Sequence, residues 1–128
     1  MLNIEETAKA IVHLSIKVHK TLGPGLLESV YQKCLAHELE KAGHEVTCET
    51  NIPVKYGTIS IDMGFRADMI IDDQVIIENK TVDKIAPIHE AQLLTYLKVT
   101  GLQFGFLLNL NVIIMKDGIK RMIYNIER

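Results

Sequence analysis

The chain has 128 residues, of which 48% are hydrophobic, and a formal net charge of −2. This length suits one domain that buries roughly two-thirds of the surface of its unfolded chain, so a single domain over residues 1–128 is predicted. No apolar run reaches the roughly 20 residues that span a bilayer, and the N-terminus lacks a basic segment followed by an apolar one. We therefore expect a cytoplasmic protein without membrane contact. The negative charge gives no sign of strong nonspecific binding to nucleic acid.

Two helices are predicted before the first strand. Apolar residues recur at spacings of three and four over residues 5–22, as in an amphipathic helix, and Gly23-Pro24-Gly25 ends it. The predicted inward positions are Ala8, Ile11, Val12, Ser15, Val18 and Leu22. A second helix is predicted over residues 26–42, with Gly43 suited to a left-handed C-terminal cap. Its predicted inward positions are Leu27, Val30, Tyr31, Cys34, Leu35 and Leu39.

From Val46 onward the hydrophobic pattern changes to a period of two, which predicts strands. Pro53 has no N–H to donate, so it predicts an edge strand or an irregularity at this point. Residues 59–71 and 75–82 are predicted to form a long hairpin, and Pro87 suits the first position of a helix that runs to Thr100.

Three more strands are predicted after this helix, over residues 104–110, 112–115 and 119–124, with Asp117-Gly118 as the last turn. The predicted order is ααβββαβββ. It suits an α/β (α+β) domain in which helices pack on a mixed sheet. Two cysteines, Cys34 and Cys48, form neither a Cys-x-x-Cys pair nor a disulfide framework, so reduced thiols in the core are expected.

The loop of the predicted hairpin decides whether two acids, Asp68 and Glu78, meet. Directly opposed residues of an antiparallel pair point to the same face, so the acids share a face only across an odd-numbered loop. A three-residue loop, residues 72–74, pairs the two acids. It sets Arg66, Asp68, Glu78 and Lys80 beside Ile70 and Ile76 on one face, and Ala67, Met69, Ile71, Val75 and Ile77 on the other. A two-residue loop would bury carboxylates among apolar side chains at a cost of several kcal/mol, so the pattern favours the paired register.

Two carboxylates side by side suit a hard divalent cation. Without a cation between them they repel each other, and the pKa of one rises. Oxygen ligands favour Mg²⁺ or Mn²⁺, and Lys80 would orient a water or stabilise charge that develops on a phosphate. The alternative from spacing alone is a surface hairpin in which Arg66 and Lys80 neutralise the acids, each ion pair contributing at most about 1 kcal/mol.

Four segments of the chain resemble one protein family. Asp68 and Glu78-Asn79-Lys80 resemble the D…(D/E)xK signature of the PD-(D/E)XK nuclease superfamily. Residues 25–31, GLLESVY, match GxxExxY, and residues 87–96, PIHEAQLLTY, resemble the helix after the core motif in the small GxxExxY family of that superfamily. The resemblance runs from about His19 to Asn125. It implies a restriction-endonuclease-like core, with a mixed central sheet flanked by helices and the acids at one edge.

The resemblance also implies roles for the motif residues. Asp68 and Glu78 would be metal ligands, the main-chain carbonyl of Asn79 would be a third, and Lys80 would sit beside the attacking water. Asn79 departs from the family pattern, in which the residue between the acid and the lysine is usually apolar. Its side chain is expected on the core-facing side, where an amide without partners costs about 1 to 3 kcal/mol.

Glu28, Gln92 and Tyr96 would complete the site implied by the resemblance. Glu28 would bring a further acid from the second helix, while Gln92 and Tyr96 share one helical face and would line the same cleft. Each also has a structural interpretation, because an acid near a helix start favours the macrodipole and the other two residues suit packing. His19 and His89 are interpreted as surface or packing histidines rather than ligands.

The resemblance implies a metal-dependent nuclease that hydrolyses phosphodiester bonds of nucleic acid, with DNA as the favoured substrate. A homodimer is expected, because two sites would serve two strands. Two alternatives stay open. One is a catalytically inactive nuclease-fold module that binds nucleic acid or a protein partner, which the acidic balance and the 5% aromatic content allow. The other is an accessory subunit whose helices face a partner.

Overall fold

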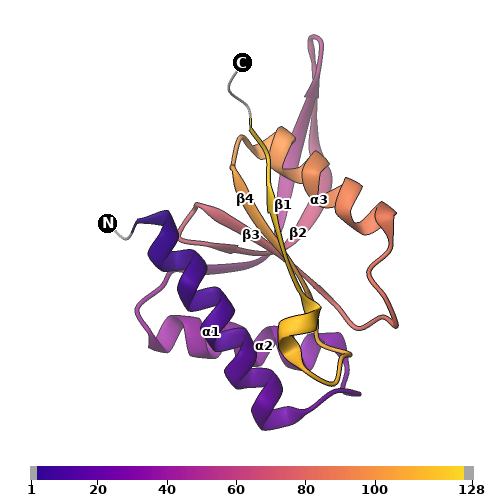
Figure 1. Ribbon diagram of the computed structural model, residues 1–128. Helices are drawn as coiled ribbons and strands as arrows, with labels where there is room; N and C mark the ends of the chain where they lie inside the picture. Colours follow the sequence, from indigo (N-terminus) through magenta and orange to yellow (C-terminus); the bar gives the residue numbers. More distant parts are fainter. Residues whose placement is uncertain (1–2, 126–128) are drawn as a thin grey trace.

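Figure 1 shows the computed structural model of the chain, which describes residues 3–125. The helices are α1 (Ile4–Leu22), α2 (Glu28–Lys41) and α3 (Pro87–Thr100), with a short 3-10 helix η1 (Met115–Gly118). The strands are β1 (Val46–Tyr56), β2 (Ile59–Ile71), β3 (Val75–Lys80), β4 (Phe104–Asn109) and β5 (Ile119–Ile123). They form one sheet in the order β1-β2-β3-β4-β5, in which only β3 and β4 are parallel. Residues 1–2 and 126–128 of the predicted domain lie outside the described residues.

Local signals determine where the helices begin and end. The side chain of Asn3 caps α1 by accepting a hydrogen bond from the N–H of Glu6 at 2.9 Å, and Gly23 ends this helix at a φ of 78°. Pro87 is the first residue of α3, and Gly101 ends it in the left-handed conformation. These ends agree with the predictions. None of the helices in the described part of the chain has the length and apolar character of a membrane span.

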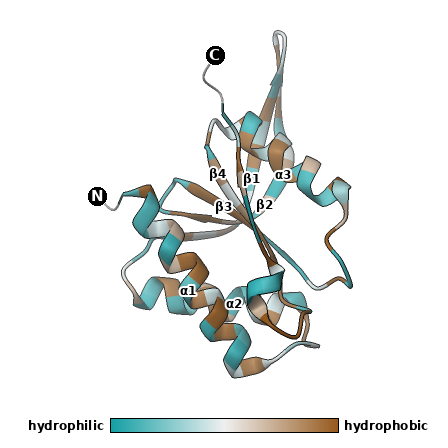
Figure 2. Cartoon of the chain, viewed as in Figure 1, coloured by the Kyte–Doolittle hydropathy of each residue, from teal (hydrophilic) through white to brown (hydrophobic). Residues whose placement is uncertain are grey.

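Two apolar cores lie on the two faces of the sheet. The core on the α1 and α2 side takes Met69, Ile71, Val75, Ile77, Phe106 and Leu108 from the strands. The core on the α3 side takes Ala67, Ile70, Ile76, Leu107 and Met122 from the strands. Because β3 and β4 are covered on both faces, their sequences are nearly continuous apolar runs. Figure 2 shows this apolar character along β3.

Several predicted core positions are exposed or only partly buried. Leu22, Leu27 and Val30 are 36%, 73% and 36% exposed. They lie in or beside the connection between α1 and α2, at the bottom of Figure 1. Cys48, which was expected in the core, is exposed on the outer strand β1, and Cys34 is half-buried. Both thiols are free, as predicted.

The strand predicted over residues 112–115 is wrong. This segment runs through bends into η1, and its residues Ile113 and Ile114 are 91% and 60% exposed. Leu108 of β4 pairs directly with Ile119 of β5, so the residues between them have to reverse the chain rather than add a strand. The apolar composition of the segment had suggested a strand, but the topology makes it the connection.

β2 and β3 pair in the predicted register near their turn and then separate. Their ladder contains the pairs Ile71 with Val75, Ile70 with Ile76, and Met69 with Ile77. The three-residue loop is therefore confirmed. The predicted ladder pairs of Asp68 with Glu78 and of Arg66 with Lys80 do not form, because the ladder ends one pair earlier. Ala67 lies in the α3-side core rather than on the predicted face with Met69 and Ile71.

Beyond the body of the sheet, β1 and β2 continue as a two-stranded arm, residues 54–63 (Figure 1). β1 is an edge strand, and its register against β2 shifts between Ile52 and Val54, so the prediction made from Pro53 is confirmed. Four large apolar side chains of the arm are exposed: Tyr56 by 78%, Ile59 by 55%, Ile61 by 48% and Met63 by 58%.

Candidate metal and active site

The two acids of the motif meet where β2 and β3 separate. The N–H of Asp68 donates to Oε2 of Glu78 at 3.0 Å, and the N–H of Asn79 donates to Oδ2 of Asp68 at 2.9 Å. Side-chain carboxylates thus take the place of the main-chain ladder, and each acid is hydrogen-bonded to the opposite strand. Both acids keep a second oxygen that these two bonds do not use.

Burial raises the pKa values of both acids, and a neighbouring negative charge adds to this effect at each of them, Asp68 for Glu78 and Glu49 for Asp68. Glu78 is 7% exposed, and burial together with the charge of Asp68 raises its pKa to about 7. For Asp68, burial outweighs the hydrogen bond from Asn79 and the attraction of Lys80, so its pKa also lies above the ordinary value. A nearby cation would favour the ionised form of both groups.

Lys80 and Glu28 bring one positive and one further negative charge to the pair. The ammonium group of Lys80 acts to lower the pKa values of Glu28, Asp68 and Glu78, so it lies within electrostatic reach of all three. Glu28 is the first residue of α2, and burial followed by the charge of Asp68 raises its pKa. The structure therefore brings these four predicted residues into one charged group.

Tyr31 fixes the turn that leads into α2 and its acid. This side chain is fully buried. Its hydroxyl donates to the carbonyl oxygen of Gly23 and accepts from the N–H of Leu26 at 3.1 Å. The glutamate and the tyrosine of the GxxExxY segment thus act at the same helix start, one as a charge near the site and the other as its structural anchor.

α3 contributes Tyr96 to the neighbourhood of the acids. Its ring stacks on Phe65 with centroids 4.0 Å apart, and burial followed by the charges of Glu78 and Asp68 raises its pKa. Gln92, one turn earlier, is exposed to solvent, and its part in the site stays a prediction.

Both histidines serve the fold, in agreement with their interpretation. Nδ1 of His89 accepts from the N–H of Ala86 at 3.0 Å at the start of α3. His19 is 5% exposed, and its Nε2 lies 2.7 Å from the carbonyl oxygen of Val112. Each ring therefore holds a chain segment in place.

Two buried amides near the site were missed in the sequence. Gln32 of α2 accepts a hydrogen bond from Nδ2 of Asn79 at 3.3 Å. Asn109, at the end of β4, accepts from the N–H of Val82 at 3.1 Å and donates to the carbonyl of the same residue at 2.9 Å, which fixes the segment after β3. A signal existed for both, since Gln32 follows the acid of α2 by one helical turn and Asn109 ends an apolar run.

The donor set fits a hard divalent cation. The carboxylates of Asp68 and Glu78 and the main-chain carbonyl of Asn79 are oxygen ligands of the kind that Mg²⁺ and Mn²⁺ take. Within residues 3–125, no group of three or more His, Cys, Asp and Glu side chains comes together as a metal site. Glu28 thus does not complete a three-carboxylate set, and two acids with one carbonyl suit a cation that retains several waters.

Comparison with known proteins shows which family the chain belongs to. Residues 5–122 match the family model of the PD-(D/E)XK nuclease superfamily. The chain belongs to this superfamily. It is also similar to the crystal structure of SSO0001, with 29% sequence identity and a TM-score of 0.51 over 77% of this chain and 50% of that chain. The chain therefore spans about half the length of SSO0001, and no curated protein sequence matches it.

Membership of the PD-(D/E)XK nuclease superfamily confirms the predicted fold class, a restriction-endonuclease-like mixed sheet flanked by helices. The superfamily consists of nucleases, which typically use divalent metal ions, so its chemistry agrees with the oxygen donors found at the separated strands.

Proposed function

We propose that this protein is a metal-dependent nuclease of the GxxExxY family that hydrolyses phosphodiester bonds of DNA. The observation that carries the proposal is the pair of acids, Asp68 and Glu78, each hydrogen-bonded to the opposite strand beside Lys80. The superfamily match over residues 5–122 supports the reaction class.

In this proposal Asp68, Glu78 and the main-chain carbonyl of Asn79 hold Mg²⁺ or Mn²⁺. When bound, the cation polarises the phosphate and lowers the pKa of a water molecule. Lys80 stabilises the negative charge that develops on the phosphate. Glu28 on α2 and Gln92 on α3 are assigned in this proposal to position substrate and water.

Cleavage by variants of the same size as the wild-type protein tests the proposal. The purified protein should cut DNA with Mg²⁺ or Mn²⁺ and leave it intact with a chelator. Glu78→Gln and Lys80→Met should each lower the cleavage rate by about 100-fold or more. Lys116→Met, an exposed lysine in η1, serves as the control and should cleave like the wild type. The proposal fails if the wild type cuts neither DNA nor RNA with either metal.

Metal binding provides a second test that does not depend on the substrate. Calorimetric titration of the wild-type protein with Mn²⁺ should show binding, and Asp68→Asn should abolish it, because an amide oxygen carries no charge to hold the cation. Equal binding by both proteins would place the metal elsewhere.

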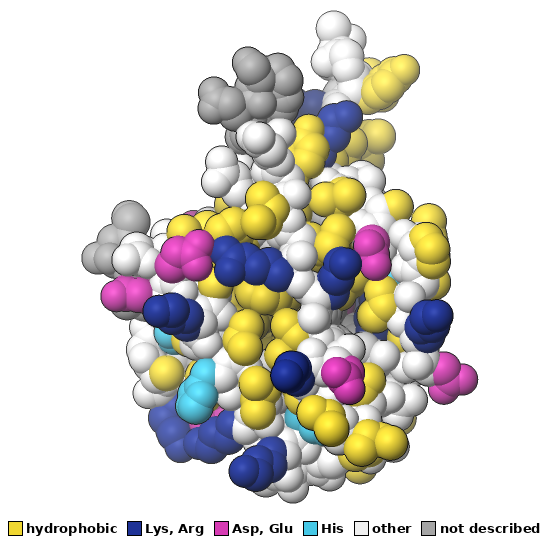
Figure 3. All heavy atoms as spheres, viewed as in Figure 1, with side chains coloured by type: hydrophobic (Ala, Val, Ile, Leu, Met, Phe, Trp, Pro, Cys, Tyr) yellow, Lys and Arg dark blue, Asp and Glu magenta, His cyan; other side chains and the backbone are white. Residues whose placement is uncertain are grey.

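We also propose that the protein acts as a homodimer, because two sites are needed for the two strands of a duplex. A single copy has little electrostatic attraction for DNA, since the net charge is −2 and Figure 3 shows Lys and Arg on one face spread among apolar and acidic side chains. A second copy would double the area that contacts the duplex.

A further inference from the structure

The side chain of Asn79 is a buried amide in the centre of the motif. It is 0% exposed and lies between Glu78 and Lys80 on β3. Its Nδ2 donates to Oε1 of Gln32 at 3.3 Å and lies 3.3 Å from Sδ of Met69. Its Oδ1 is buried, without a hydrogen-bond partner in the described part of the chain. Gln32 is therefore the one oxygen acceptor that holds this amide in the described part of the chain.

The main chain of Asn79 carries two groups of the proposed metal site. Its N–H donates to the carboxylate of Asp68, and its carbonyl is the proposed third ligand. A rotation of the peptide planes on either side of this residue would displace one of these groups. A fixed side chain limits such rotation, because the χ1 angle and the backbone conformation of a buried residue are coupled.

Gln32 links this residue to the helix that supplies another acid of the site. It is 9% exposed and lies one turn after Glu28 on α2, so both side chains leave the helix on the same side. Nε2 of Gln32 donates to Oε2 of Glu49 on β1 at 3.4 Å, which orients the amide so that its oxygen faces Asn79. A single side chain thus connects α2, β1 and the motif strand.

We infer that Gln32 is a positioning residue of the metal site and that it acts through the amide of Asn79. The inference rests on the proposed function. Gln32 does not contact the acids. By accepting the hydrogen bond of Asn79 it fixes the motif strand against α2, and with it the N–H and the carbonyl that set the metal ligands. The amide of Asn79 and its partner Gln32 on α2 therefore form one hydrogen-bonded unit.

Calorimetric titration with Mn²⁺, at a temperature where every protein is folded, tests this role. Gln32→Leu should weaken Mn²⁺ binding about tenfold, the lower end of the effect of losing an outer hydrogen-bond partner in metal sites. The double variant Gln32→Leu/Asn79→Leu should bind Mn²⁺ within about threefold of the wild type, because two apolar groups replace both partners and leave no amide unsatisfied.

Thr7→Val is the control for a role in stability alone. Thr7 is fully buried, and its hydroxyl donates to Asp72 at 2.7 Å at the β2–β3 turn, away from the acids. This variant should lower the melting temperature and leave Mn²⁺ affinity unchanged. DNA cleavage should follow metal affinity: Gln32→Leu should require more Mn²⁺ for half-maximal rate while KM for DNA at saturating metal stays constant.

Each outcome decides a specific point. Equal Mn²⁺ affinity of Gln32→Leu and the wild type would overturn the inference and leave the proposed function standing. A double variant as weak as the single one would show that Gln32 does not act through Asn79, which also overturns it. If Gln32→Leu does not fold, a folded double variant with near-wild-type affinity supports the inference and one with weak affinity refutes it. A wild type that does not bind Mn²⁺ overturns the proposed function, and the inference falls with it.

Discussion

Glu78 destabilises the metal-free protein when it ionises. Its pKa of about 7 lies above the ordinary value of 4.5, so the folded protein holds the proton more tightly than the unfolded chain. At a pH below 4.5 the carboxyl is protonated in both the folded and the unfolded protein, so no charge is buried on folding. As the pH rises toward 7, the unfolded chain ionises first, and the free energy of unfolding falls. The acid at the centre of the proposed chemistry thus weakens the fold at neutral pH.

Replacing this acid by its amide should therefore stabilise the metal-free protein. At pH 8 with EDTA, Glu78→Gln should raise the free energy of unfolding by on the order of 2 kcal/mol, because the glutamine keeps an acceptor for the N–H of Asp68 without a buried charge. At pH 4 the two proteins should be about equally stable. Urea denaturation at both pH values measures the difference.

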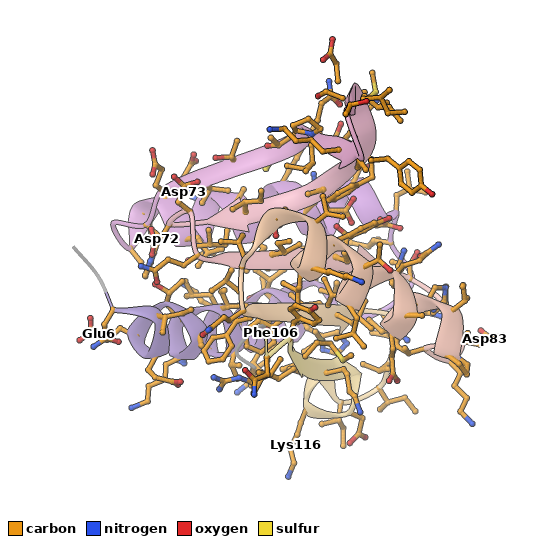
Figure 4. All side chains as sticks on the ribbon, turned by 90° about the horizontal axis from the view of Figure 1, so that it is seen from above. Glu6, Asp72, Asp73, Asp83, Phe106 and Lys116 are labelled. Atoms are coloured by element: carbon orange, nitrogen blue, oxygen red, sulfur yellow. The ribbon has the colours of Figure 1, made fainter. Side chains whose placement is uncertain are left out.

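Asp83 offers a control for this measurement. It is exposed in the loop after β3 and projects from the body in Figure 4. Asp83→Asn should change stability by less than about 0.5 kcal/mol at either pH. A Glu78→Gln variant that is less stable than the wild type at pH 8 would contradict the cost assigned to the ionised acid.

The acid pair could be predicted from residues alone, but the way the acids are held could not. The alternation of apolar and polar positions around Asp68 and Glu78 was sufficient to predict that the two acids lie close together. The N–H group from which each carboxylate accepts a hydrogen bond depends on where the strands separate. The spacing of Gln32 from Glu28 indicates that both residues face the same side of α2, but the contact of Gln32 with Asn79, 47 residues away, could not be predicted from any local pattern.

At the scale of elements, the separation of β2 and β3 follows from their other neighbours. β3 pairs with β4 along its whole length, from Val75 with Phe104 to Lys80 with Asn109. β2 follows β1 from Val46 with Ile71 onward. β2 is thus held by β1 and β3 by β4, and the acids lie where β2 and β3 diverge. The sequence predicted a hairpin but not these outer pairings, which form between distant residues.

Asp72 fastens the β2–β3 turn to two other elements. Its carboxylate accepts hydrogen bonds from the hydroxyl of Thr7 on α1 and from Nδ1 of His44, both at 2.7 Å, and from the N–H of Glu45 at 2.9 Å. Burial raises its pKa, but these hydrogen bonds outweigh burial and leave the pKa below the ordinary value. Figure 4 shows this turn at the same end of the molecule as the start of α1, where Glu6 lies.

The contribution of Asp72 to stability should disappear in acid. A depressed pKa in the folded state stabilises the protein above the ordinary value of 3.8, and this contribution is lost as the pH falls through the lower folded value. Asp72→Asn should therefore lower the free energy of unfolding by about 1 to 3 kcal/mol at pH 6 and by much less at pH 2.5. Urea denaturation across this range measures the loss.

The adjacent Asp73 is a closely matched control. The φ angles of Asp72 and Asp73 are 54° and 56°, so asparagine suits the left-handed backbone at both positions. Asp73 is exposed, and Asp73→Asn should change stability little at any pH. Equal losses in the two variants would assign the effect to the backbone of the turn rather than to the hydrogen bonds of Asp72.

At the scale of the whole molecule, the arm exposes apolar side chains that nothing in a single copy covers in the described part of the chain. Val54 pairs with Ile61 and Tyr56 with Ile59, so these four side chains share one face of the ribbon, while Lys55 and Ser60 occupy the other. The exposed apolar side chains offer on the order of 500 Å² per copy. Two such faces packed together would bury about 1,000 Å², the lower limit of a specific interface.

We expect the proposed dimer to form through these apolar faces. Sedimentation equilibrium at tens of micromolar should show a dimer for the wild type and a monomer for Ile59→Lys, which places a charge on the apolar face. Ser60→Lys adds the same charge on the opposite face of the same strand, so it should stay dimeric. A monomeric wild type would remove the proposed dimer, and dissociation of both variants alike would show that the face does not matter.

The overall architecture was more accessible from sequence than its details. The two N-terminal helices, the hairpin and the helix after it were predicted with nearly correct bounds, because caps and glycines mark their ends locally. Residues 112–115 were assigned wrongly, because a β-branched composition does not reveal that the chain must turn back there. The sequence predicted the exposed arm as part of the sheet. The alternation of apolar and polar residues is the same whether the apolar face packs against a core or faces solvent.

The two carboxylates that bridge the separated strands β2 and β3 also restrict which substitutions can remove activity without loss of stability. Alanine in place of Asp68 or Glu78 would leave the N–H of Asn79 or of Asp68 without its acceptor, at a cost of about 1 to 3 kcal/mol. Asparagine or glutamine would silence the chemistry and keep the acceptor. In homologues that have lost catalysis, we therefore expect asparagine or glutamine at these two positions more often than alanine. An amide pair there would indicate a protein that no longer cleaves but whose sheet still depends on these side-chain acceptors.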